Sequence, residues 1–187
     1  MNVVKSMLCA ASKRRNSVSL KDLFITEMQQ RLTKEQAWQK IKHYCAYQER
    51  SHFETKQKLY SFGLYKNEVE DLLSKLIEED YLNEERFAEH FAGGKFRMKQ
   101  WGKVKIAYEL KQKQVSSYNI RRALQSIPDA DYVATLQRLA EAKWQLLRGE
   151  QYIVRQAKTT SFLLQRGFEP ALIQKAIRQL KNTDQAN

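Results

Sequence analysis

A five-position apolar pattern occurs three times along the chain without gaps. The three copies are Leu59, Gly63, Leu64, Val69 and Leu73; Leu110, Gln114, Val115, Ile120 and Leu124; and Leu163, Gly167, Phe168, Ile173 and Ile177. Each copy has internal spacings of 4, 1, 5 and 4 residues, and the copies are 51 and then 53 residues apart. Periods of this length indicate a tandem array of small structural units that pack on their neighbours.

The pattern describes a junction between two helices. Gly63 and Gly167 stand where a helix should end, because glycine readily adopts the left-handed conformation that closes a helix C-terminus. The next apolar residue fills the gap between the helices, and Val69 and Leu73 then lie on one face of a short second helix. Gln114 replaces the glycine in the second copy, which should cost stability unless this copy closes with a different turn.

Each junction is preceded by a further helix, so that one unit contains three helices. Capping boxes predict two helix starts in the first unit, at Thr33 with Gln36 and at Ser51 with Glu54. In "YLNEERFAEHF", which begins the second unit, Asn83 is placed to cap a new helix whose phenylalanines face inward.

The composition agrees with a helical chain, since 187 residues contain only 6 Gly and 2 Pro. We therefore predict an all-α protein of three tandem three-helix repeats that form an elongated, curved helical array. The expected boundaries are an N-terminal extension over 1–32, predicted to be disordered, repeats over 33–80, 81–126 and 127–181, and a tail over 182–187. A unit of about 50 residues can hardly bury enough apolar surface alone, so neighbours should support each other. One compact bundle of nine helices is the alternative.

Charge is distributed unevenly along the chain, whose formal net charge is +12. Residues 64–90 contain nine acids and three bases, whereas residues 93–125 contain nine bases and one acid, Glu109. Such a density of like charge is self-repulsive and favours an anionic partner, such as nucleic acid or a protein already bound to it. The second repeat is therefore predicted to supply the main anionic contact.

The candidate partner-binding and nucleic-acid-binding residues are the ten bases of the second repeat and one base of the third. They are Arg86, Lys95, Arg97, Lys99, Lys103, Lys105, Lys111, Lys113, Arg121, Arg122 and Lys158. A solvated helix surface is the alternative for the whole set, and ion pairing with nearby acids is the alternative for Arg86. Trp101 and Tyr108 are interpreted as core residues rather than as platforms for stacked bases, while Phe96 is left open between the two.

Other classes of protein find little support in the sequence. Two cysteines, Cys9 and Cys45, are too few for a disulfide framework and favour a reducing, intracellular setting. The three histidines are far apart without metal-ligand spacing, and no phosphate loop or nucleophile–base pair is apparent, so we expect no metal, no cofactor and no enzymatic activity. No stretch approaches the roughly 18 apolar residues of a membrane span.

Three segments resemble the RecX family: "RSHFETKQKL" (50–59), "YLNEERFAEHF" (81–91) and "WGKVKIAYELKQKQVS" (101–116). The most specific mark is the pattern YLxxxRFAxxF followed by GxxxIxxELxxxxV. The resemblance covers about residues 33–180, and Gln114 stands where the family usually has glycine.

This resemblance implies a bacterial-type, cytoplasmic and non-enzymatic regulator of the RecA recombinase, built from three tandem three-helix repeats. Such a protein binds RecA and the RecA–DNA filament, restrains filament growth, ATPase activity and strand exchange, and thereby acts in DNA repair, homologous recombination and the SOS response. A monomer is expected, and some family members bind single- or double-stranded DNA directly. The alternative is a stand-alone DNA-binding or architectural protein with helix-turn-helix-like units, for which "SYNIRRAL" offers Asn119, Arg121 and Arg122 to base edges.

Overall fold

The computed structural model describes residues 31–186, all of whose regular elements are α-helices. They are α2 (Lys34–Tyr47), α3 (His52–Ser61), α4 (Lys66–Glu78), α5 (Glu84–Lys99), α6 (Lys103–Gln112), α7 (Ser117–Gln125), α8 (Asp129–Leu146), α9 (Tyr152–Gln165) and α10 (Pro170–Ala186). An N-terminal extension was predicted over residues 1–32, and residues 1–30 of it lie outside the described residues. Helix α10 continues beyond residue 181, where the third repeat was expected to end.

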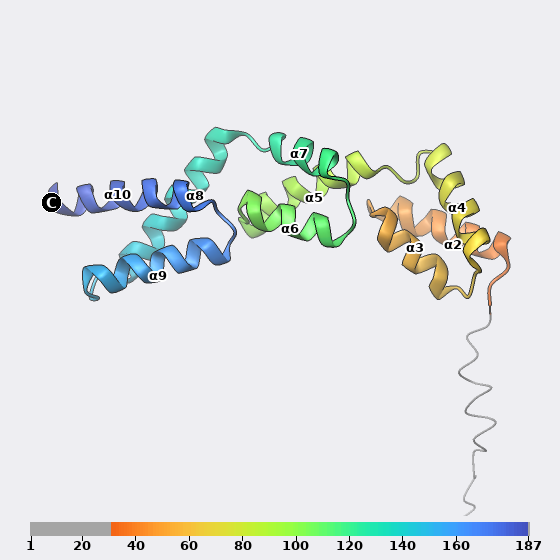
Figure 1. Cartoon of the computed structure of the whole chain (residues 1–187), viewed down its shortest axis with the longest axis horizontal. Helices are drawn as coiled ribbons and strands as arrows, with labels where there is room; N and C mark the ends of the chain where they lie inside the picture. The colour runs from red at the N-terminus through yellow and green to blue at the C-terminus, as the bar shows by residue number, and fades with distance from the viewer. Residues whose placement is uncertain (1–30, 187) are drawn as a thin grey trace, which may run out of the picture.

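The helices form three consecutive groups of three. We call them unit 1 (α2–α4), unit 2 (α5–α7) and unit 3 (α8–α10). In every closely packed pair of helices, both helices belong to the same unit. The units follow one another along an elongated, curved body (Figure 1). The predicted array of three-helix repeats is therefore confirmed, and the single compact bundle is wrong.

Local sequence signals begin these helices as expected. The side chain of Thr33 accepts a hydrogen bond from the backbone of Gln36, and Ser51 and Glu54 form the second complete capping box. At the start of α5, Asn83 Oδ1 accepts a hydrogen bond of 3.0 Å from the Arg86 N–H. These bonds satisfy backbone donors that have no partner inside the helix.

The three helix–helix junctions share one backbone conformation. Gly63 has a φ of 79°, Gly167 a φ of 85° and Gln114 a φ of 57°. The second copy thus keeps the left-handed turn without the glycine, and the residue after it confirms the equivalence. Val115 N–H donates to Leu110 O at 3.1 Å, and the corresponding bond in unit 3 is 3.2 Å long.

The apolar side chains form two separate cores. Unit 1 has a core of its own, which includes Ile41, Leu59 and Leu76. Units 2 and 3 share a continuous core that extends from Phe87 to Ile177. The expected mutual support therefore holds between units 2 and 3, while unit 1 buries its apolar residues internally.

The contact between units 2 and 3, which we call the seam, brings two backbones together. Gly102 N–H donates to Arg166 O at 2.8 Å, and Val104 N–H donates to Gly167 O at 3.1 Å. A Cβ atom on Gly102 would lie 2.1 Å from Gly167 O, so no larger residue fits without separating the units.

A buried tyrosine completes the seam. The hydroxyl of Tyr132 accepts a hydrogen bond from Lys103 N–H at 2.9 Å and donates one to Glu169 at 2.6 Å. Its ring lies between Phe96 and Phe168, with centroid distances of 5.8 and 5.2 Å. Phe96, whose role the sequence left open, is therefore a core residue.

The contact between units 1 and 2, which we call the joint, is polar instead. Arg86 Nε lies 2.6 Å from Glu49 and its Nη1 lies 2.9 Å from Asp80. On the other side of the joint, Lys113 Nζ lies 2.5 Å from Glu54. Unit 1 is thus held to unit 2 largely by ion pairs rather than by shared apolar surface.

Candidate functional site

Five of the eleven candidate cations form ion pairs within the chain. The pairs are Arg86 with Glu49 and Asp80, Lys103 with Asp129, Lys113 with Glu54, Arg122 with Glu85, and Lys158 with Glu150. The pairs of Arg86 and Lys113 join unit 1 to unit 2, and Lys103 lies at the seam. These three side chains therefore help to assemble the fold, and the ion-pairing alternative describes Arg86 in the structure.

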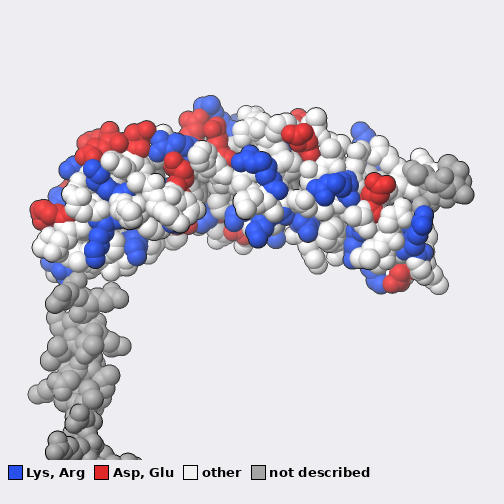
Figure 2. Space-filling model, turned by 180° about the vertical axis from the view of Figure 1, so that it is seen from behind, with Lys and Arg blue, Asp and Glu red and all other residues white. Residues whose placement is uncertain are grey.

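The other six candidates form no ion pair with a described residue. They are Lys95, Arg97, Lys99, Lys105, Lys111 and Arg121. Of the nine bases in residues 93–125, three are paired and six remain, and all six belong to unit 2. Lys and Arg side chains are prominent over the middle of the molecule, whereas acidic side chains gather along one edge toward unit 1 (Figure 2). Unit 2 therefore presents the uncompensated positive charge that its composition predicts.

Three lysines lie over two aromatic rings, and a fourth, Lys99, follows one helical turn after Lys95 on α5. This basic cluster comprises Lys95, Lys99, Lys105 and Lys113. Lys95 Nζ lies 5.0 Å from the Phe91 ring centroid and 5.1 Å from that of Trp101, while Lys105 Nζ lies 4.6 Å from the Trp101 centroid. Cation–π attraction of this kind holds ammonium groups at a fixed place on the surface.

The remaining candidates are not part of this cluster. The Arg97 guanidinium folds back over Gly93, where an added Cβ would lie 2.8 Å from Nη1. Lys111 and Arg121 are exposed on α6 and α7. Lys158 lies on α9 in unit 3. The candidates thus form one compact cluster and several isolated charges rather than a continuous patch.

The structure agrees with the sequence interpretation for Trp101 but not for Tyr108. Trp101 is partly buried and packs against the shared core of units 2 and 3, in agreement with a core role. Tyr108 is 61% exposed, so its interpretation as a core residue is wrong. Unit 3 packs closely against unit 2 at the seam, but the side of α6 that carries Tyr108 faces solvent.

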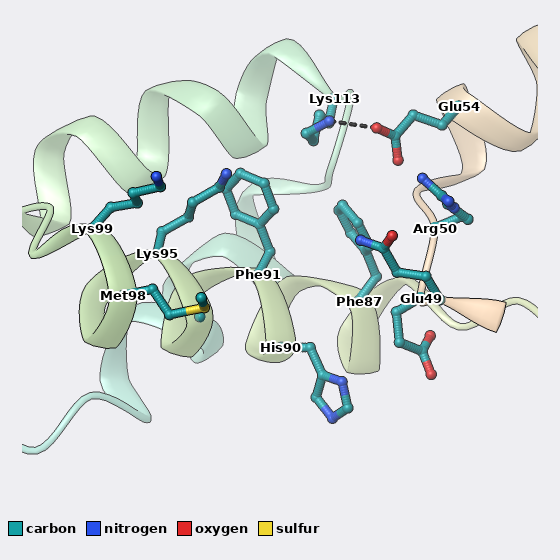
Figure 3. Close-up of a pocket in the computed structure, with 12 residues that line it drawn as sticks. Glu49, Arg50, Glu54, Phe87, His90, Phe91, Lys95, Met98, Lys99 and Lys113 are labelled. Carbon is teal, nitrogen blue, oxygen red and sulfur yellow. Dashed lines mark hydrogen bonds and ion pairs between the residues drawn. The ribbon is translucent and has the colours of Figure 1, made fainter.

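A pocket of about 360 Å³ lies in the joint, and Lys95, Lys99 and Lys113 of the basic cluster form part of its wall. We call it the inter-unit pocket. Phe87, Phe91 and Met98 of α5 line it from unit 2, and Arg50 and Glu54 line it from unit 1. Phe87 and Phe91 project from α5 on the side where Lys113 and Glu54 meet (Figure 3).

The acids at the pocket are already engaged. Glu49 pairs with Arg86, and Glu54 pairs with Lys113. Burial alone would raise the pKa of Glu54, but hydrogen bonds from Lys113 and from the Ser51 N–H outweigh it and hold the pKa below its ordinary value. Glu54 therefore stays ionised and neutralises Lys113.

Arg50 is held differently from the other cations at the pocket. Its guanidinium lies 4.2 Å from the ring centroid of Tyr44, and its Nε is buried without a hydrogen-bond partner in the described structure. The side chain is thus fixed by stacking, with donor capacity left over.

Sequence reasoning did not identify this pocket. Its residues come from two units, and the approach of Arg50 to α5 depends on how those units meet. The adjacent glycines Gly93 and Gly94 inside the predicted helix were a usable signal, because glycine disfavours a helix interior and needs a reason there.

Within residues 31–186, no set of three His, Cys, Asp or Glu residues is grouped so that it could hold a metal ion. In the same part of the chain, no helix combines the length and the hydrophobicity needed to cross a bilayer.

Fold and surface together define a class: tandem three-helix units, joined end to end, with the positive charge concentrated on the middle unit. The family model for the second three-helix domain of RecX matches residues 83–124, and that for the third three-helix domain of RecX matches residues 129–177. The chain belongs to the RecX family.

Sequence relatives agree with this assignment, and a solved structure is similar in fold. The chain is 32% identical to the regulatory protein RecX of Chlorobium limicola, over 71% of this chain and 82% of the relative. It is 24% identical to the RecX of Oceanobacillus iheyensis, over 89% of this chain but only 61% of that longer protein. Its fold is similar to the crystal structure of RecX from Lactobacillus salivarius, with a TM-score of 0.73 at 24% identity, covering 79% of this chain and 96% of that one.

Proposed function

We propose that this protein is a non-enzymatic regulator that binds the RecA recombinase and its nucleoprotein filament and restrains filament growth, ATPase activity and strand exchange. Membership of a family of regulatory proteins supports the regulatory role. The single observation that carries the proposed contact is the set of six unit 2 cations without an ion-pair partner among the described residues.

Those cations favour a polyanionic partner for a physical reason. Like charges held close together repel, and this cost is offset when a partner of opposite charge binds. Lys and Arg contacts to phosphates depend on charge and not on base identity, which suits a regulator that must act along any DNA sequence.

The elongated body suits a partner that is itself a long assembly. Lying along a groove of the filament, the three units would touch several recombinase protomers and combine many weak contacts into one strong attachment. An inhibitor bound in this way blocks the addition of further protomers or the conformational cycling that accompanies ATP hydrolysis.

The direct test adds the purified protein to RecA filaments on single-stranded DNA and measures ATP hydrolysis and filament length. We expect both to fall with increasing protein. Unchanged hydrolysis together with unchanged filament length would reject the proposed function.

A charge variant tests the contact surface. Changing Lys95, Lys99 and Lys105 together to Gln should weaken filament binding by tenfold or more and flatten its salt dependence, by roughly 2 to 3 in the slope of log affinity against log salt if all three touch phosphates. Lys103 and Arg122 are left intact because their ion pairs stabilise the fold.

The matched control changes three exposed cations outside unit 2, Lys40, Lys66 and Lys175, to Gln. It removes the same amount of charge and should leave binding within about twofold. Equal losses in the two triple variants would mean that only net charge matters and that unit 2 has no special role.

The alternative of stand-alone DNA reading finds no support in the geometry of α7. Asn119 Nδ2 donates to Glu84 at 2.6 Å, and Arg122 pairs with Glu85 at 2.8 Å. Two of the three side chains that could reach base edges are thus held by acids of α5, which would have to be displaced. A mobility-shift comparison on duplex DNA, with and without recombinase, separates this alternative from the proposed function.

A further inference from the structure

We propose that the inter-unit pocket is a binding site for a peptide segment that combines a bulky apolar side chain with flanking acidic residues. The site shares Lys95 and Lys99 with the proposed phosphate contact, and the inference does not depend on which protein supplies the segment. Four features of the pocket support the inference: its apolar wall, its glycine, its charge balance and the state of its aromatic rings.

The pocket offers apolar surface that the fold leaves unused. Met98 is 82% exposed and lines the pocket together with Phe91, which is only partly buried. A flexible thioether adapts to different apolar partners, and methionine is common at surfaces that bind peptides. An apolar side chain inserted here would cover this exposed surface and exclude water from it.

Gly94 lies in the wall of the pocket, and close packing does not require a glycine there. It lies inside helix α5, where glycine is unfavourable compared with alanine, and it does not have a positive φ. A Cβ atom added at Gly94 would meet nothing within 4 Å, so no close packing requires its absence. Because Gly94 lines the pocket, any side chain at this position would enter the volume that a ligand would occupy.

The charge balance at the pocket favours an acidic ligand. Four cations line it, Arg50, Lys95, Lys99 and Lys113, and two acids, Glu49 and Glu54. Glu54 neutralises Lys113, and Glu49 pairs with Arg86 outside the lining. Three lining cations, Arg50, Lys95 and Lys99, therefore form no ion pair with a described carboxylate. Carboxylates of a ligand would pair with them.

The state of the rings favours a peptide over a nucleobase. Phe87 is only 4% exposed and so has no open face on which a base could stack. The Phe91 centroid lies 5.0 Å from Lys95 Nζ and 5.6 Å from Lys113 Nζ, so ammonium groups already occupy positions over this ring. Base recognition on single strands normally relies on open aromatic faces. A peptide needs only a side-chain-sized space for its apolar residue, and its carboxylates can pair with the lining cations.

The test uses a pair of neighbouring glycine variants. Gly94→Leu places a side chain in the pocket, whereas Gly93→Leu places the same side chain on the same helix outside the lining, where the added Cβ lies closest to the mobile end of Arg97. Both changes replace glycine by a better helix former, so both proteins should unfold at or above the wild-type temperature.

The probes are fluorescent peptides of the form Asp-Asp-Phe-Phe-Asp-Asp, with versions in which Phe is replaced by Ala or Asp by Lys, and binding is measured by anisotropy. We expect the acidic phenylalanine peptide to bind the wild type with an affinity that falls with salt, and the two altered peptides to bind at least about tenfold more weakly. Gly94→Leu should weaken binding about tenfold or more, and Gly93→Leu should change it less than about twofold.

A measurement on the unaltered chain protects the test from a folding failure. Amide chemical shifts of the wild-type protein, followed during titration with the same peptide, should change mainly at α5 and at residues 48–54. Absence of binding by the wild type, equal affinity of the two leucine variants, or shift changes confined to other regions would overturn the proposal. Displacement of the peptide by a twelve-residue oligothymidylate whose own binding is lost in Gly94→Leu would assign the pocket to nucleic acid instead.

Discussion

The three equivalent turn positions allow a quantitative prediction. Gln114 adopts the left-handed conformation that glycine adopts at positions 63 and 167, and its exposed side chain makes no hydrogen bond in the described structure. The left-handed conformation costs a residue with a Cβ atom about 1–2 kcal/mol. Replacing Gln114 by glycine would remove this cost. Glycine also has more conformational freedom in the unfolded chain, which offsets about 0.4–1 kcal/mol of the stabilisation. Gln114→Gly should therefore stabilise the protein by about 0.5–1 kcal/mol.

The reverse substitutions, glycine to glutamine at positions 63 and 167, should both lower the free energy of unfolding, and by more at position 167. At Gly63 an added Cβ would lie 3.2 Å from the backbone of Arg31, a tight contact in addition to the backbone strain, so Gly63→Gln should cost about 1–2 kcal/mol. At Gly167 the Cβ would lie 2.2 Å from Lys105 Cβ and 2.6 Å from Lys105 N. The seam would have to open, and Gly167→Gln should cost at least about 3 kcal/mol.

Urea and thermal unfolding, followed by circular dichroism and tryptophan fluorescence, measure this series. Trp38 lies in unit 1, Trp101 in unit 2 and Trp144 in unit 3, so variants that keep a single tryptophan can locate a loss confined to one part of the chain. A change of 1 kcal/mol corresponds to roughly 2–4 °C in midpoint for a chain of this size. Destabilisation by Gln114→Gly, or equal effects at positions 63 and 167, would refute the reasoning from turn geometry.

Two further predictions concern pH. Burial, and after it the hydrogen bond to Glu169, raises the pKa of Tyr132. As the pH rises above about 10, this tyrosine ionises in the unfolded chain before it ionises in the folded one, so the stability of the wild type should fall. Tyr132→Phe should cost about 1–2 kcal/mol at neutral pH and lack this alkaline loss, as pH-dependent urea titrations will show. Despite burial, the bond from Lys113 depresses the pKa of Glu54, so its contribution is full above about pH 5 and is lost as the pH falls through the depressed value. Glu54→Gln should therefore be less stable at neutral pH and respond less to acid, measured by the same titrations.

The fold could be predicted because its determinants are local and periodic. Helix caps such as Asn83 and the spacing from Leu59 to Leu73 depend on residues close in the sequence, and the repeat then fixes how often the unit recurs. The division into two cores could not be predicted in this way. It depends on the seam at Gly102, where two backbones approach from residues more than 60 positions apart.

The candidate site could be predicted only in outline. The run of bases from Lys95 to Arg122 placed the charge on unit 2, because composition alone locates an excess of one sign. Which bases remain uncompensated is a question of distant partners. Lys113 meets Glu54 across 59 residues of sequence, and Arg86 meets Glu49 across 37. No helical spacing reveals such pairs, and they decide which cations a ligand can use.

The absence of a shared apolar core between unit 1 and unit 2 has a mechanical consequence. Flexing the molecule at that point separates charged groups that water solvates well, so the opposing force is weak and decreases with ionic strength. Flexing at the other contact would expose tightly packed aromatic rings and break backbone hydrogen bonds. The molecule should therefore behave as a stiff rod of six helices with a compliant three-helix arm, able to follow a track whose pitch varies.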